Sequence, residues 1–261
     1  ETLDQNQIFF FIIVMVLTAI PVGFIAGLFG VGGGLIMVPI LFYIFDNIGL
    51  DRSFIMHLAV GTSFAIIIPT SIISTITHMK FKAVDFNIVK TFGIFVIIGV
   101  VFGTIFAASL KTSNLILFFS IMTGIFAFYF LLSKEKKNPI QKEISLIYRI
   151  VSGFLSGFLS APVGIGGGLI NTSILKMFGY PINIAIGSSA AVGFLIALVG
   201  ALGFVISGNY LNIEAPLSLG FVNIPAFLIF VPITSLMAKV GAKTVHKIDK
   251  QIIGKIFGIF L

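Results

Sequence analysis

Uncharged hydrogen-bond donors are the groups of this sequence best suited to binding a ligand. Two hydroxyl pairs, Thr62/Ser63 and Ser188/Ser189, each follow a glycine within an apolar segment, and Asn171 follows a glycine cluster. A hydroxyl or an amide can donate to an anion, but it can equally bond one helix to another or cap a helix. Because the pairs recur in register with the glycine clusters, a ligand-binding role is considered beside the structural one for them and for Asn171, and both roles stay open for all five residues.

Each hydroxyl pair is matched by a cluster of glycines, at 30–34 and at 164–168. Glycine weakens a helix by about 1 kcal/mol relative to alanine, so each cluster is predicted to end one helix just before the next begins. The first N–H groups of a helix lack intrahelical partners and carry the positive end of its dipole, so they can bind an anion without a buried cation. Close packing, or a kink without a ligand, is the alternative. The candidate backbone donors are Gly32, Gly33, Gly34, Gly166, Gly167 and Gly168.

The composition places these residues in a membrane. Of the 261 residues, 58% are hydrophobic and 10% are charged, whereas a soluble domain has about 25% charged residues. Apolar runs of roughly 20 residues without strand-like alternation predict an all-α polytopic membrane protein surrounded by a lipid bilayer. The net charge of +7 is explained by the loops between spans, so no nucleic-acid partner is predicted.

Ten apolar segments can be marked along the chain. The second and the seventh have about 13 residues, too few to span a core about 30 Å thick at about 1.5 Å per residue, so half-helices are predicted there. About eight to ten membrane segments are therefore expected. The ten lie near 7–29, 33–45, 54–78, 87–110, 113–133, 144–160, 165–178, 181–208, 216–238 and 248–261.

The glycine-rich stretch occurs twice. GFIAG (23–27) matches GFLSG (153–157), GVGGGLI (30–36) matches GIGGGLI (164–170), and AVGTS (59–63) matches AIGSS (185–189). Each copy holds an odd number of segments, five, so the second copy would enter the membrane in the opposite sense. The prediction is an inverted repeat, with a first transmembrane repeat at 1–133, a linker at 134–143 and a second repeat at 144–261. Many transporters use such a repeat to build a site at the midplane.

Basic residues predict the orientation of the chain. All of them except Arg52, Lys111 and Lys176 lie in or next to the loops 79–90, 134–143 and 239–250, and Lys176 lies late in a half-helix that would end on the same side. Cytoplasmic loops are rich in lysine and arginine. We therefore expect a multi-pass protein of the plasma membrane with these three loops in the cytoplasm. Whether each glycine-broken pair of helices crosses the membrane or re-enters is left open, because both options return the chain to the same side.

The sequence offers little catalytic chemistry. It has no cysteine, no acidic residue in the middle of a span, and no arrangement typical of a nucleophile or a metal, so no enzyme activity, metal or cofactor is predicted. His57 and His78 lie at opposite ends of the third segment, where interfacial or capping roles are commoner than proton transfer. GxxxG spacings predict close helix packing and leave a homodimer open; they begin at Gly23, Gly99, Gly153 and Gly254.

The doubled motif resembles the TauE/SafE family of sulfite exporters, which are membrane permeases. GLFGVGGGLIMVPIL is close to the family's first repeat pattern, and GIGGGLI with AIGSSAA is close to its second. The resemblance implies transport of sulfite or related organosulfonate anions, commonly outward. Asn171, Thr172 and Ser173 stand where the family often keeps an apolar Val-Pro, as the first repeat does at Val38 and Pro39. This departure bears on the identity of the substrate rather than on the family.

The combined expectation is a secondary transporter that exports small sulfur-containing anions by alternating access. The oxyanion would lie between the two broken helices, held by the glycine N–H groups, the hydroxyl pairs and Asn171. Because Asn171 and Thr172 replace apolar residues of the first repeat, the substrate is expected to lean toward the second half. An anion channel and a non-transporting membrane scaffold are the alternatives.

Overall fold

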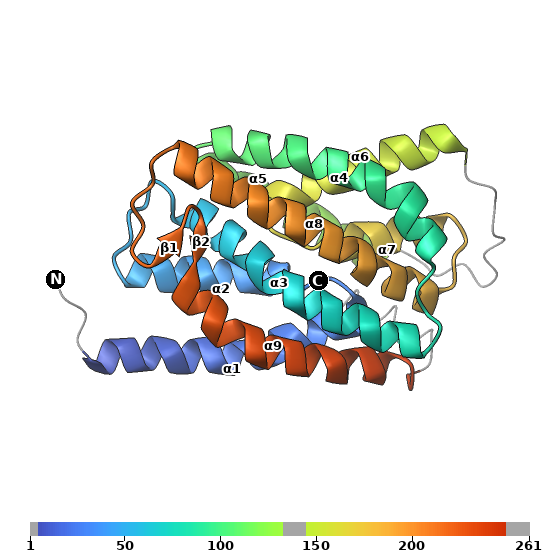
Figure 1. Ribbon diagram of the computed structural model, residues 1–261, viewed down its shortest axis with the longest axis horizontal. Coiled ribbons are helices and arrows are strands. Elements are labelled where there is room, and N and C mark those ends of the chain that lie inside the picture. Colours follow the sequence, from blue (N-terminus) through green and yellow to red (C-terminus); the bar gives the residue numbers. More distant parts are fainter. Residues whose placement is uncertain (1–4, 133–144, 249–261) are drawn as a thin grey trace.

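The computed structural model describes residues 5–132 and 145–248, which form helices and one short β-hairpin. Figure 1 shows them side by side in a bundle, with the N-terminus at one end. In chain order the elements are α1 (Gln5–Phe29), α2 (Gly34–Asn47), α3 (Ile55–Lys80), α4 (Phe86–Ser109), α5 (Thr112–Leu132), α6 (Leu146–Val163), α7 (Gly168–Met177), α8 (Ile182–Tyr210), β1 (Ser218–Leu219), β2 (Val222–Asn223) and α9 (Ile224–Val245).

Six helices in the described ranges are long and apolar enough to cross a membrane: α1, α3, α4, α6, α8 and α9. The prediction of an all-α membrane protein is confirmed in this form. α2 has 14 residues and α7 has 10, so at about 1.5 Å per residue α7 extends for only about 15 Å, half the thickness of a bilayer core. Both are the predicted half-helices. The tenth predicted segment, 248–261, lies almost entirely outside the described residues.

Both glycine clusters end a helix and reverse the chain. α1 ends at Phe29 and α2 begins at Gly34, while α6 ends at Val163 and α7 begins at Gly168. Five glycines in the two breaks have left-handed backbone angles, which side chains disfavour, with φ between 64° and 80° at Gly30, Gly32, Gly33, Gly164 and Gly167. In Figure 1, α2 runs back toward the end at which α1 began. Each pair is thus a long helix followed by a short helix that returns.

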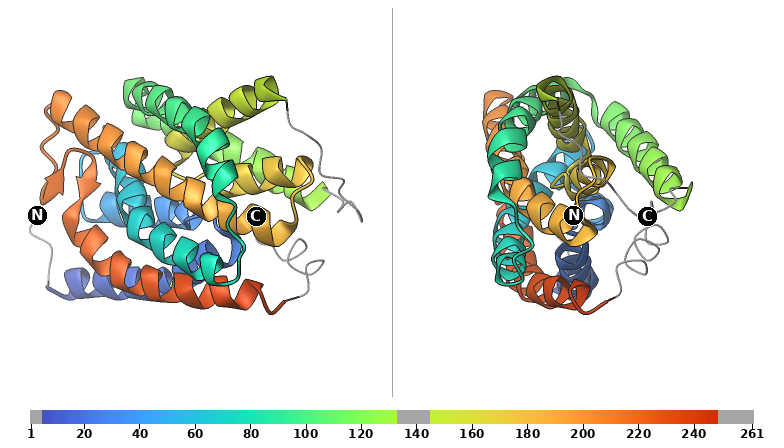
Figure 2. Two further views of the ribbon diagram at one scale, coloured as in Figure 1. Left: turned by 45° about the vertical axis from the view of Figure 1, so that its right-hand side comes forward. Right: turned by 90° about the vertical axis from the view of Figure 1, so that its right-hand side faces the viewer.

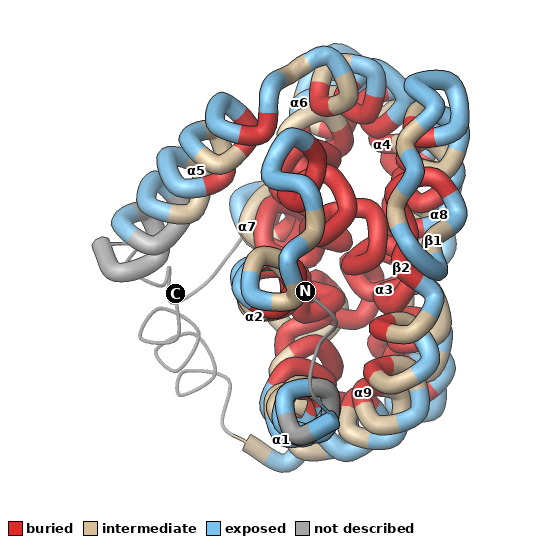
Figure 3. The backbone as a smooth tube through the Cα atoms, turned by 90° about the vertical axis from the view of Figure 1, so that its left-hand side faces the viewer, coloured by how far each residue is buried: buried red, intermediate tan, exposed pale blue. Residues whose placement is uncertain are grey.

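α3 and α8 pack against each other and are the most buried of the long helices; Figure 3 shows α3 in the buried interior of the bundle. The half-helix α2 packs on α3, and α7 packs on α8. On the two flanks, α1 lies along α9 and α6 lies along α4, so each flank joins helices that are distant in the sequence. α5 diverges from the rest of the bundle (Figure 2).

Small residues permit the close contacts on both flanks. A Cβ atom on Gly27 would lie 2.0 Å from the carbonyl oxygen of Ala238 in α9, and one on Gly157 would lie 2.0 Å from that of Val96 in α4. The GxxxG spacings that begin at Gly23, Gly99 and Gly153 therefore pack helices within the bundle, as predicted. The spacing at Gly254 lies outside the described residues.

The predicted ninth segment, 216–238, begins differently from the prediction. Residues 218–223 form the hairpin β1–β2, and α9 starts only at Ile224. Gly220 adopts a left-handed backbone with φ 54° between the strands, and the Asn223 side chain accepts a hydrogen bond from the N–H of Ala226 at the helix start. The apolar residues before Asn223 thus belong to the hairpin and not to α9.

The ends of α3 and α9 lie together at the end of the bundle opposite the N-terminus (Figure 1). The predicted loop 79–90 and the described part of the loop 239–250 are therefore on one side, which agrees with a shared compartment for their lysines. The third loop, 134–143, lies outside the described residues.

Candidate functional site

The two glycine breaks cross at the centre of the molecule and fit into each other. A Cβ atom on Gly34 would lie 2.0 Å from the carbonyl oxygen of Gly164, and one on Gly168 would lie 2.0 Å from that of Gly30. The two contacts are reciprocal, because Gly30 and Gly164 occupy matching places in the repeated motif, as do Gly34 and Gly168. The last glycine of each motif is therefore required by the backbone of the other break.

The crossing buries two helix starts that have no side-chain cap. The residues before α2 and α7 are Gly33 and Gly167, and neither end has a capping hydrogen bond from a side chain. All six predicted glycines are buried, and within residues 5–132 and 145–248 their N–H groups have no backbone or side-chain acceptor. A buried N–H group without a partner is rare and costs about 1–3 kcal/mol. Two adjacent helix starts of this kind favour an anion between them.

The first hydroxyl of each pair holds the start of another helix. The N–H of Asn223, the residue before α9, donates to Thr62 Oγ1 over 2.9 Å, and the N–H of Asp85, the residue before α4, donates to Ser188 Oγ over 2.9 Å. The glycine before each hydroxyl makes room for the same incoming chain. A Cβ atom on Gly61 would lie 2.2 Å from the carbonyl oxygen of Phe221. Thr62 and Ser188 thus have structural partners, and their role toward a ligand stays a prediction.

The second hydroxyl of each pair distinguishes the two halves. Ser63 Oγ donates to the carbonyl oxygen of Gly164 in the second break over 3.0 Å. Ser189 Oγ is buried and has no partner among the described residues. Its neighbour Ala190 lies beside the first break, since a Cβ on Gly30 would be 3.3 Å from the Ala190 nitrogen. Ser189 therefore keeps a free donor next to the crossing.

Asn171 places another free donor at the second break. Its Oδ1 accepts a hydrogen bond from the hydroxyl of Ser156 in α6, whereas its Nδ2 is buried without a partner in the described chain. A Cβ atom on Gly167 would lie 2.9 Å from this Nδ2, so the amide lies over the start of α7. The hydroxyl of Thr172 is likewise buried and unpaired. The second break is the more polar one, in agreement with the sequence.

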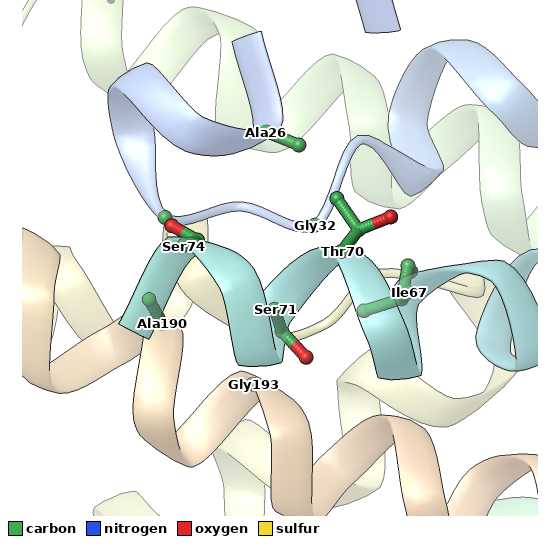
Figure 4. Close-up of a pocket in the computed structure, with 9 residues that line it drawn as sticks. Ala26, Gly32, Ile67, Thr70, Ser71, Ser74, Ala190 and Gly193 are labelled. Carbon is green, nitrogen blue, oxygen red and sulfur yellow. The ribbon is translucent and has the colours of Figure 1, made fainter. Parts of the chain in front are cut away.

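A pocket lies beside the first break, between the break, α3 and α8 (Figure 4). It comprises about 200 Å³ between atoms and is too tight in this conformation for a water molecule. Thr70 and Ser74 lie on the side of α3 that faces the break, and Ser71 lies on the side that faces Gly193 of α8. Ser74 Oγ is buried without a partner in the described chain. Of the predicted residues, only Gly32 lines this pocket.

Sequence reasoning missed the hydroxyls of this pocket. Thr70, Ser74, Thr77 and His78 recur at spacings of three and four, which places them along one side of a helix. That stripe was available in the sequence as a signal. It lacks a counterpart in the second repeat, where the positions matching Thr70 and Ser74 hold Ile196 and Gly200. Motifs that occur in both halves therefore do not include it.

The crossing region has no charged side chain among its described contacts. The pocket is lined by small, apolar and hydroxyl residues, and the ion pair between Arg52 and Asp46 joins the end of α2 to the exposed loop that follows it. Within the described ranges no group of three acidic or histidine side chains could hold a metal ion. Among the described residues, the groups here that could recognise a ligand are neutral donors and helix dipoles.

A family model described as "Sulfite exporter TauE/SafE" matches residues 15–261 of the chain, a range that includes both breaks. The chain belongs to the TauE/SafE family. A "Probable membrane transporter protein" of Haemophilus influenzae is 32% identical over 253 residues, which is 97% of this chain and 96% of that protein. One of Methanocaldococcus jannaschii is 32% identical over 239 residues, 91% of this chain and 87% of its own length. No solved structure is significantly similar to the chain.

These relatives settle the general class of the molecule. The TauE/SafE chain described here is a multi-pass membrane protein of a transporter family, and it is not an enzyme. Both predictions are confirmed. The family membership also gives a physical context to the crossing, because broken helices that meet inside a membrane protein are a common way to build a transport site.

Proposed function

We propose that this protein is a secondary transporter that exports small sulfur-containing anions, such as sulfite or organosulfonates, by alternating access. The oxyanion lies between the two breaks, bound by the N–H groups of Gly32–Gly34 and Gly166–Gly168 together with Asn171 and Ser189. The observation that carries the proposal is the pair of buried, uncapped helix starts at the crossing. Thr62, Ser63 and Ser188 carry structural hydrogen bonds, and their part in binding stays a prediction.

The donor set suits an oxyanion. The unpaired side chains at the crossing are an amide N–H and hydroxyls among the described residues, and a sulfonate or sulfite presents several acceptor oxygens. Neutral donors also avoid a buried cation, which would be costly in the apolar interior when the site is empty. Three side-chain donors near the second break and α8 have no partner among the described residues, namely Asn171 Nδ2, Thr172 Oγ1 and Ser189 Oγ, which supports a substrate that leans toward the second half.

The exchanged packing of the flanks supports an inverted repeat around this site. α1 and α6 hold matching places in the repeated motif. Each packs on the fourth helix of the other half, α1 on α9 and α6 on α4. The hydrogen bonds of Thr62 and Ser188 at the starts of α9 and α4 follow the same correspondence. We infer that the two halves are related by an approximate two-fold axis in the membrane plane, with the basic loops cytoplasmic, in a plasma membrane.

Alternating access fits the pocket better than an open pore does. The pocket beside the first break is too tight for water, so this conformation has no continuous wet path through it. A carrier would widen the pocket on one side at a time. An anion channel would need both sides open together.

Flux measurements test the proposal. Proteoliposomes with the purified protein should take up labelled sulfite and a labelled sulfonate with saturation, and substrate on the opposite side should accelerate the flux. Single-channel currents would instead indicate a channel, and the absence of flux through folded protein would favour a scaffold. Gly33→Val and Gly167→Val should abolish the flux, because φ is 80° and 64° at these positions. Gly124→Val is the control, since a Cβ there meets nothing within 4 Å.

A further inference from the structure

Two histidines that are distant in the sequence meet where α3 and α9 end. His78 Nδ1 lies 2.9 Å from His246 Nε2, and the ring of Phe81 stacks on His246 with a centroid distance of 4.2 Å. His78 is fully buried on the last turn of α3, while His246 directly follows α9 and is partly exposed. The proposed anion site uses neither residue.

The histidine pair lies at one end of the hydroxyl-lined pocket. His78 Nε2 lies 3.2 Å from the carbonyl oxygen of Gly27 in α1. Gly27 follows Ala26, and His78 follows Ser74 by one helical turn; Ala26 and Ser74 both line the pocket. The pair therefore connects α1, α3 and α9 across the end of the pocket that faces the lysine-rich loops. For a solute to pass from the pocket to that side, these three helices have to separate.

Hydrogen-bond chemistry fixes how many protons the closed pair can hold. A carbonyl oxygen only accepts, so Nε2 of His78 carries a hydrogen and donates it to Gly27. In neutral His78 the Nδ1 atom is then an acceptor, and His246 donates to it from Nε2. One added proton can be shared, if it sits on His78 Nδ1 and His246 accepts. When both rings bind a proton to become imidazolium, two N–H groups face each other over 2.9 Å, and the contact has to break.

The surroundings of the pair disfavour two positive charges on the closed histidines. Lys80 and Lys82 flank Phe81, and Lys243 and Lys247 lie on either side of His246 in the sequence. α8 contributes Gly187 next to the Cβ of His78, and the described residues that touch the pair include no carboxylate. Burial lowers the pKa of His246 from its ordinary value. The closed pair is therefore stable near neutral pH, and it loses stability as pH falls below about 6.5.

We propose that His78 and His246 form a proton-binding site that closes the pocket toward the ends of α3 and α9 and opens it when both rings are protonated. Opening takes two protons from the water on that side, one for each imidazole, and no other bond is made or broken. The proposal rests on the proposed function only in assigning the gated solute as the transported anion. It makes the proton a ligand of this transporter.

Cysteine labelling tests the gate without any substrate. The chain has no cysteine, so Ser74→Cys would supply the only thiol, inside the pocket, and Lys80→Cys would supply an exposed reference thiol at the same end of α3. The ratio of their maleimide labelling rates removes the intrinsic pH dependence of thiol reactivity. We expect this ratio to rise at least about tenfold between about pH 8 and about pH 5.

Histidine variants decide whether the pair causes the change. His246→Gln, at the less buried position, should remove the pH dependence of the ratio while the protein remains folded. His57→Gln is the matched control: His57 lies on the same helix at its opposite end, with its Nε2 3.1 Å from the carbonyl oxygen of Ala107, and its variant should keep the pH dependence. A flat ratio in the unmodified histidine background, or an unchanged rise in His246→Gln, would overturn the proposal.

Transport measurements separate this inference from the proposed function. A sulfonate is the suitable probe, because its charge stays constant over the tested pH range whereas that of sulfite changes. Lower pH on the side of α3's end should accelerate sulfonate flux, and His246→Gln should abolish that acceleration while it retains exchange at equal pH. Flux without any pH effect would reject the gate and leave the transporter assignment standing. If pocket labelling depends on pH but the protein shows no flux, the gate would stand and the transporter assignment would be rejected.

Discussion

The two glycine breaks share one backbone design but carry different side chains. In each, the last glycine of the motif accommodates a carbonyl oxygen of the other break, and a hydroxyl nearby holds the start of a flanking helix. The first break continues into Met37, the second into Asn171. The backbone features repeat because both halves must cross in the same way. Side chains that differ are free of that requirement, so they are where substrate recognition can reside.

The helix packing near the crossing differs in the same sense. Ile67 and Gly193 each stand four positions after the second hydroxyl of their pair. The Ile67 side chain fills the space over Gly32, where a Cβ would lie 2.8 Å from it, whereas Gly193 has no side chain and admits the carbonyl oxygen of Gly166, which a Cβ would meet at 2.7 Å. One half therefore supplies bulk and the other supplies space. An exact copy of either half would give a crossing that is too full or too empty.

The strongest test of the shared backbone is to add one methyl group to each break. Gly34→Ala and Gly168→Ala both place a Cβ 2.0 Å from a backbone oxygen, so each should destabilise the fold by about 3 kcal/mol. Thermal unfolding and size-exclusion chromatography in detergent measure the effect. Gly124→Ala, in open space on α5, should leave stability unchanged or slightly raised. Tolerance of only one of the two substitutions would break the likeness of the halves.

The hydroxyls that hold helix starts should also behave alike. Thr62→Val leaves the buried backbone N–H of Asn223 without its acceptor, and Ser188→Ala does the same to the partly buried N–H of Asp85, so each should cost about 1–2 kcal/mol. Unfolding in denaturant provides the comparison, with Thr62→Ser as the variant that keeps the acceptor. Costs that differ by more than a factor of two to three would show that the two contacts are not equivalent.

The unpaired amide of Asn171 should give the second half a role in substrate binding that the first half lacks. Asn171→Met copies the residue of the first half and removes the donor over the start of α7. Because a lost hydrogen bond costs about 1–1.5 kcal/mol, KM for sulfite or a sulfonate should rise about tenfold. Ser156→Ala removes the partner of Oδ1 but spares Nδ2, so it serves as the control. An unaltered KM in Asn171→Met would move recognition away from the second break.

The smallest effects are expected for Ser63 and Ser189, the second hydroxyls of the two pairs. The first should affect stability and the second should affect substrate binding. Ser63→Ala removes a hydrogen bond to Gly164 and should lower stability by about 1 kcal/mol. Ser189→Ala removes a hydroxyl without a partner in the described chain, so it should leave stability unchanged and weaken substrate binding several-fold. Parallel unfolding and uptake measurements on the two variants are sufficient. Equal effects on both properties would contradict the assignment of Ser189 to the substrate.

The sequence predicted the elements that large local penalties enforce. Four glycines within Gly30–Gly34 could not continue a helix, and 10 to 14 residues could not span a bilayer, so the breaks and the half-helices were foreseeable. The GxxxG packing followed from the same logic. The start of α9 was missed, although Asn223 and Pro225 together are a signal for a helix start; hydrophobicity alone concealed it.

Contacts between distant segments were beyond the sequence. Nothing near His78 indicates that His246 will meet it, and nothing near Thr62 identifies Asn223 as its donor. Ser63 and Ser189 look the same in sequence, and only the crossing gives one of them an acceptor. The candidate site was thus predictable as a set of residue types at two breaks. Which of those donors remain free depends on how the flanks pack.

The packing of α1 along α9 and of α6 along α4 also constrains the order in which the protein is made. α1 leaves the ribosome before the other described helices, but its flank partner α9 is the last of them, so α1 has to remain in lipid until α9 has been inserted. Its apolar surface suits lipid as a temporary neighbour. Neither half can complete its own flank, so a chain divided in the linker at 134–143 should assemble only when both pieces are produced in the same cell.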